Sequence, residues 1–129
     1  MRQLLLALAL AVSTACCAAQ TADARVRSAL DLLADVIDPS YALAMQGCIA
    51  RQDQIMTAGE RDDLPAADVD SALHVVTVRC NRVRTAFETM RQQHDRAREI
   101  VGRGQVDEAQ HAVDEIRALW SALQEVIDG

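Results

Sequence analysis

Two cysteines and one histidine in the middle of the chain are the residues whose types could do chemistry. Cys48, Cys80 and His94 all stand among apolar residues. Two thiols can form a disulfide or a redox pair, and a histidine can ligate a metal or a haem. The cellular compartment indicates whether the two thiols form a structural disulfide. Cytosolic thiols stay reduced, whereas thiols of exported proteins usually pair.

The first residues of the chain predict export. Arg2 precedes an apolar run from Leu4 to Val12, and small residues follow, which is the plan of a secretory signal peptide. The run is too short to span a bilayer, so we expect no transmembrane span in the mature chain. We expect residues 1–19 to be the signal peptide and the mature protein, 20–129, to be a single periplasmic or secreted domain.

Two alternatives remain open at this end of the chain. Cleavage can instead follow Ala24. Cys16 stands close after the apolar run, where bacterial lipoproteins carry their lipid. Ala15 fits the lipoprotein pattern, whereas Ser13 occupies a position where a large aliphatic residue is usual. Lipidation of Cys16 would give a lipid-anchored envelope protein.

The apolar residues of the mature chain recur every three or four positions, which predicts helices. Half of all residues are apolar, but only three are aromatic, which favours closely packed helices over strands. Pro39 disfavours helix at Asp38 and suits the first position of a new helix, so it separates two of them. Gly59 suits a helix C-cap. The expected helices span about 21–37, 39–58, 66–102 and 105–128.

The third expected helix carries the clearest pattern. Its apolar residues alternate at spacings of four and three, which is the a/d seam of a helical bundle. The seam consists of Val69, Leu73, Val76, Cys80, Val83, Phe87, Met90, His94, Ala97 and Val101. Such a seam can pack inside one chain or against a second copy in a homodimer. The predicted fold is all-α, an up-down antiparallel bundle of three to four helices.

The stretch GRGQVDEAQHAV, residues 102–113, resembles the turn between the two helices of a tetratricopeptide repeat. The resemblance covers roughly twenty residues, and no second copy follows at the 34-residue period of such repeats. It implies an antiparallel helical hairpin at this place and nothing about activity.

The spacing of the two mature cysteines predicts that they form a disulfide. If the helices on either side of Leu64 form an antiparallel hairpin, Cys48 lies sixteen residues before the turn and Cys80 sixteen after it. The two are then level, as the short Cα separation of a disulfide requires. A redox or catalytic pair is the alternative, but such pairs usually stand in a C-x-x-C turn.

His94 is the one polar residue of the seam, and we expect it to contact another protein group. The alternative is a haem- or metal-binding bundle, in which His94 pairs with a thioether from Met45, Met56 or Met90. The chain lacks the C-x-x-C-H motif of covalent haem and the Glu-x-x-His pairs of di-iron bundles. We therefore predict no cofactor.

A basic strip and the overall charge bear on the partners. Arg84, Arg91 and Arg98 are seven residues apart and flank the seam, so they can bind an acidic partner protein or form ion pairs within the bundle. The net charge of −6 argues against a nucleic-acid partner.

No catalytic motif is present: the sequence has no Gly-rich phosphate loop, no G-x-S-x-G and no H-E-x-x-H. The function predicted from sequence is therefore non-catalytic, a protein–protein interaction in the periplasm or cell envelope with an unidentified partner.

Overall fold

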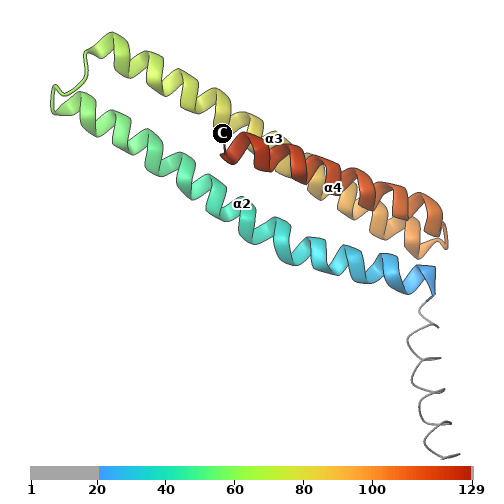
Figure 1. The fold of residues 1–129 in the computed structure, drawn as a ribbon. Coiled ribbons are helices and arrows are strands. Elements are labelled where there is room, and N and C mark those ends of the chain that lie inside the picture. The colour runs from blue at the N-terminus through green and yellow to red at the C-terminus, as the bar shows by residue number, and fades with distance from the viewer. Residues whose placement is uncertain (1–20, 129) are drawn as a thin grey trace, which may run out of the picture.

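The computed structural model describes residues 21–128, and this part of the chain forms three helices and no strand. Helix α2 spans Ala22–Glu60, α3 spans Ala66–Gly102 and α4 spans Val106–Asp128. The first two form a long antiparallel hairpin, and α4 folds back along the C-terminal part of α3 (Figure 1). The all-helical, up-down prediction is confirmed for these residues, but with three helices instead of four.

The count differs because α2 runs through Pro39 without a break. The helices predicted at 21–37 and 39–58 are therefore one helix. A proline inside a helix removes a hydrogen bond and costs about 3 kcal/mol. Packing on both sides offsets that cost, since Ile37 is buried and Tyr41 packs against the same apolar cluster.

Both turns end their preceding helix with a Schellman hydrogen-bond pattern. After α3, Gly104 takes the left-handed conformation with φ of 81°. After α2, Asp62 takes that conformation with φ of 56°, and the Asp63 N–H donates to the Ala58 carbonyl at 2.9 Å. The predicted C-cap Gly59 lies one residue inside the helix instead, so it does not end α2.

Gly59 allows α2 and α3 to approach each other next to the hairpin turn. A Cβ atom added to Gly59 would lie 2.8 Å from Cγ2 of Val69 on α3. Gly47, in the same helix, has nothing within 4 Å of an added Cβ. The two helical glycines therefore differ in the space around them.

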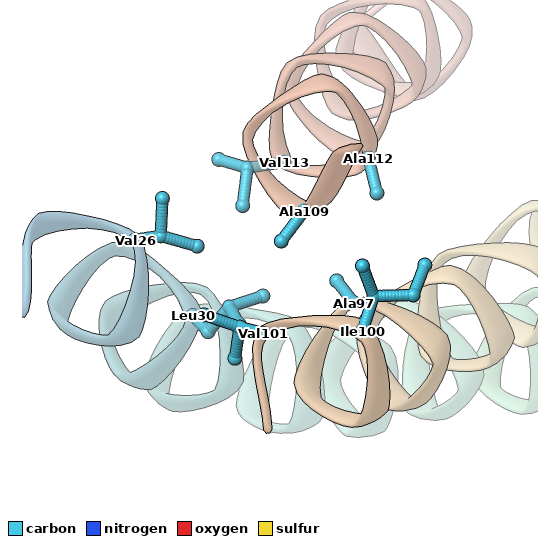
Figure 2. Close-up of a cluster of buried hydrophobic side chains, with 8 residues drawn as sticks. All are labelled: Val26, Leu30, Ala97, Ile100, Val101, Ala109, Ala112 and Val113. Carbon is cyan, nitrogen blue, oxygen red and sulfur yellow. The ribbon is translucent and has the colours of Figure 1, made fainter. Parts of the chain in front are cut away.

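Two apolar clusters form the core of the three-helix region. The first lies where α2 begins, α3 ends and α4 begins, and Figure 2 shows side chains from all three helices pointing into it. Alanines on α3 and α4 keep these helices close. Its buried members are Val26, Leu30, Ala97, Ile100, Val101, Ala109, Ala112 and Val113.

The second cluster gathers all three aromatic residues of the chain. The Phe87 ring is fully buried on α3, and its centroid lies 5.2 Å from that of Tyr41 on α2. The Trp120 ring of α4 meets Phe87 edge-on, with centroids 6.0 Å apart and planes at 71°. Phe87 thus joins the three helices, and edge-to-face pairs of this kind add about 0.5–1.5 kcal/mol beyond burial.

The hairpin of α2 and α3 is longer than α4, so its far end consists of two helices only (Figure 1). We call the three-helix region the trunk and the two-helix region the extension, comprising residues 45–60, the turn, and 66–78. Every residue of the extension is described, and Ile55 is its only buried side chain. The apolar seam of the extension is thus covered on one side alone.

The two glycines of α2 give a stability prediction. Gly47→Ala should raise the free energy of unfolding by about 0.5–1 kcal/mol, because alanine favours a helix interior and its methyl group meets open space. Gly59→Ala should lower it, since overpacking against Val69 costs about 1–3 kcal/mol. Chemical denaturation of each variant measures both changes. A Val69→Ala change should rescue Gly59→Ala, and equal gains from both glycine substitutions would contradict the close approach at Gly59.

Candidate functional site

A groove lies where the trunk meets the extension. It has a volume of about 720 Å³ and lies between α2 and α3, with the last turns of α4 at one end. Its main lining residues are Leu43, Gly47, Cys48 and Arg51 of α2, Val75, Val76, Arg79 and Cys80 of α3, and Trp120, Gln124 and Ile127 of α4.

Apolar side chains line most of the groove, and two of them are largely exposed. Leu43 is 69% exposed and Val75 is 66% exposed, although both are large apolar residues. At Gly47 a Cβ would meet nothing within 4 Å, so the wall of α2 is open at that point. An apolar surface of this kind, open and bounded by polar side chains, is typical of a binding groove.

Two arginines stand at the groove, and one of them also holds α4 in place. The Nη2 group of Arg79 donates to the carbonyls of Val126 and Ile127 at 2.7 and 2.9 Å. It therefore caps the C-terminal end of α4, where a positive charge is favoured by the helix dipole. Arg51 Nη1 donates to the side-chain oxygen of Gln54 at 3.3 Å, within its own helix. These charges favour an acidic ligand.

The cysteine pair lies in the wall of this groove. The Sγ atoms of Cys48 and Cys80 lie 2.18 Å apart and their Cα atoms 6.0 Å apart, so the pair stands at disulfide distance, as the hairpin spacing predicts. Cys80 is buried and Cys48 is half-buried. The pair joins α2 to α3 where the trunk ends and the extension begins.

His94 contacts the protein backbone. Its Nε2 lies 2.7 Å from the Leu30 carbonyl of α2, so the ring N–H donates across the helix pair. The side chain is buried, with 8% of the residue exposed. A buried donor that meets a carbonyl avoids the cost of an unmade hydrogen bond, about 1–3 kcal/mol.

The three methionines do not meet His94 from another helix. Leu30 marks the level of His94 on α2, and Met45 lies fifteen residues further along that helix, roughly 22 Å away at 1.5 Å per residue. Met56 is further still. Met90 lies one turn before His94 and is fully buried with Phe87 in the second cluster. Within residues 21–128, no group of three or more His, Cys, Asp and Glu side chains is placed to hold a metal.

The basic strip pairs mainly with α2. Arg91 lies 2.9 Å from Asp38, the residue predicted as a helix N-cap, and its guanidinium stands 4.6 Å above the Tyr41 ring. Arg98 lies 2.8 Å from Asp31. Both pairs are exposed, and such pairs contribute about 0–1 kcal/mol.

Arg84, the third member of the strip, is exposed and forms no salt bridge within the described residues. The strip therefore does not act as one surface: two of its members share their charge with carboxylates of the same chain. A shallow cleft of about 400 Å³ lies between these ion pairs and His94.

The predicted signal peptide, residues 1–19, and the candidate lipidation residue Cys16 lie outside the described residues. Between residues 21 and 128, no helix is both long enough and apolar enough to cross a membrane. Comparisons with models of protein families, with curated proteins and with solved structures find no significant match to this chain.

The sequence pattern found the cysteines of the groove but not the groove itself. Val75 is an ordinary apolar residue one position from the seam, Leu43 is an ordinary apolar residue of α2, and no spacing marks either as exposed. Their exposure follows from the point at which α4 ends on α3, which the Arg79 contacts define. A comparison of the predicted helix lengths contains that signal, since the 24 residues of the helix predicted at 105–128 cannot cover the 37 residues of the helix predicted at 66–102.

Reduction of the cysteine pair should destabilise the protein. The bond closes a loop of 32 residues, and the chain-entropy model gives a loss of roughly 3–4 kcal/mol when it opens. Thermal unfolding with and without reductant measures the change as a lower Tm. The variant with Cys48→Ala and Cys80→Ala is the control and should show no response to reductant. An unchanged Tm on reduction of the wild-type chain would contradict a structural disulfide.

Proposed function

We propose that this chain is a non-catalytic binding protein of the cell envelope that acts by holding a helix of a partner protein in the groove. The observation that carries the proposal is the exposed apolar face between α2 and α3, which begins where α4 ends. Helix-in-groove recognition needs an apolar channel between two rigid helices, with anchors from the partner at helical spacing. The groove offers such a channel.

The chemistry of the groove indicates what kind of helix it would take. Leu43 and Val75 would contact apolar side chains of the partner, while Arg51 and Arg79 would pair with its carboxylates. The partner segment is therefore an acidic amphipathic helix. Gly47 would let that helix approach α2 closely, because no side chain fills the space beside it.

A non-catalytic role is consistent with the polar groups of the described residues. His94 donates to a backbone carbonyl, and Arg91 and Arg98 pair with carboxylates of α2. These groups therefore have structural partners. Cys48 and Cys80, the two cysteines of the described residues, are paired with each other, so neither is a nucleophilic thiol in the oxidised protein.

Export to the periplasm or cell envelope is part of the proposal. It rests on the sequence of residues 1–19 and on the cysteine pair, because disulfides persist in oxidising compartments. An envelope location by lipidation of Cys16 is the alternative form of the same proposal.

The intact mass of the protein purified from its own cell envelope tests export. A chain that begins at Gln20 is expected, with the mass lowered by two hydrogen atoms for the disulfide. A chain that begins at Cys16 and carries acyl groups would support the lipid-anchored form instead. An unprocessed chain that begins at Met1 and carries free thiols would contradict export.

Substitutions on the two sides of α2 test the groove. Leu43→Glu places a carboxylate on the apolar lining and should remove partner binding. Ile49→Glu is the matched control: the residue is 56% exposed in the same helix, and it is two residues from Gly47, which turns it about 200° round the helix. Site-specific photo-crosslinking in the producing cell, with the probe at each position, measures which side of the helix meets a partner.

Both substitutions should leave the Tm almost unchanged, because exposed positions usually shift stability by about 0.5 kcal/mol or less. A crosslinked partner at position 43 and none at position 49 is the expected result. Equal crosslinking at both positions, or none at position 43, would contradict a binding role for the groove.

A further inference from the structure

The groove lies beyond the C-terminal end of α4, along the same side of α2 and α3 that α4 covers in the trunk. The last turns of α4 form one end of it, and the uncovered faces of α2 and α3 continue beyond (Figure 1). A helix placed there would contact α2 and α3 as α4 does. The inference below rests on the proposed function, since it names the partner for that same groove.

The charges of the extension are concentrated towards its two ends, with the exposed Asp53 between them. Arg51 and Arg79 stand at its base, beside the groove. The tip carries a single basic residue, Arg61, among five exposed acidic residues. These acids are Glu60, Asp62, Asp63, Asp68 and Asp70. An extension that is positively charged next to the trunk and negatively charged at its tip is complementary to a reversed copy of itself.

We propose that the occupant of the groove is the extension of a second copy of this chain, packed antiparallel so that the acidic tip of each copy lies against Arg51 and Arg79 of the other. The two hairpins then form a four-helix bundle related by a two-fold axis. Each copy fills the groove of the other in the same contact, which makes the interface self-complementary.

The lengths of the elements fit this arrangement. Arg79 marks the end of α4 on α3, and α3 extends beyond it by about 13 residues, or roughly 20 Å at 1.5 Å per residue. Both copies contribute the same length, so the tip of one reaches the end of α4 in the other. Gly47 lies within this overlap, and its open side allows two helices to approach closely.

A second copy accounts for more of the surface than an unrelated helix does. An unrelated acidic helix would cover one groove and leave the five acids of the tip close together, with Arg61 as the one basic residue among them. The antiparallel pair instead brings the tip acids to the arginines of the base and covers the apolar linings of both copies. Burial of apolar area and pairing of charge then act in the same contact.

Charge reversal at each end tests the arrangement. The base variant is Arg51→Glu, and the tip variant carries Glu60→Arg and Asp63→Arg. Sedimentation analysis of the full mature chain over a range of concentrations should show a reversible dimer. Each variant alone should weaken dimerisation by on the order of tenfold or more, because like charges then meet at both contacts. A mixture of the two variants should regain most of the wild-type affinity as a heterodimer, since the reversed charge at position 51 then meets the reversed charges at positions 60 and 63.

Two further variants separate loss of the interface from loss of the fold. Gly47→Arg fills the open side of the groove without a clash in the monomer, so it should abolish the dimer, and its Tm should equal or exceed that of the wild type at concentrations where the wild type is monomeric. Ile49→Glu, on the other side of α2, should keep the dimer. A wild-type chain that stays monomeric at all concentrations would overturn the inference, and so would a mixture of base and tip variants that fails to recover.

The outcome also distinguishes this inference from the proposed function. A monomeric chain whose position 43 crosslinks to a different protein would overturn self-association and keep the groove as a binding surface. A monomeric chain without any crosslink at position 43 would overturn both. A crosslink at position 43 to a second copy of the chain supports both.

Discussion

The apolar seam of α3 is the surface on which the rest of the structure depends. It runs from Val69 to Val101, and α2 packs along its whole length, whereas α4 packs only along the part after Arg79. Where both helices are present the seam is buried, with Phe87 and Met90 fully inaccessible. Where α4 is absent, the seam residues Val69, Leu73 and Val76 are only half-buried, and Val75 beside them is exposed. The unequal lengths of the helices thus create both the core and the groove.

The cysteine pair lies at the boundary between the three-helix trunk and the two-helix extension. A two-helix hairpin with a single buried side chain gains little from hydrophobic burial, and isolated helices of this length are marginal in water. The link between Cys48 and Cys80 holds α2 and α3 together at the base of the extension. It thereby limits the separation of the two helices at the groove, so a binding surface made of two helices can exist before any partner arrives.

Most of the fold could be predicted from local residue spacing. Features that depend on the whole folded chain could not. The seam of α3 and the level of Cys48 and Cys80 follow from periodicity and from the position of the turn near Leu64. The predicted helix break at Pro39 is wrong. The local preference of proline for a helix start is weaker than the stabilisation from packing Ile37 on α3, and only the folded chain provides that packing. The groove depends on where α4 ends, so the exposure of Leu43 could not be predicted from its local sequence.

Arg79 connects the groove to the stability of α4. A guanidinium carries five N–H donors, and two contacts from Nη2 to the carbonyls of Val126 and Ile127 leave the Nε–H and, on the opposite edge of the group, the Nη1 hydrogens for a carboxylate. A carboxylate bound to either would fix the orientation of the same guanidinium that caps α4, because the group is planar and rigid. Occupation of the groove would therefore order the last turn of α4, where Ile127 is 42% exposed. If the groove binds as proposed, a ligand and the third helix would use the same cation, Arg79.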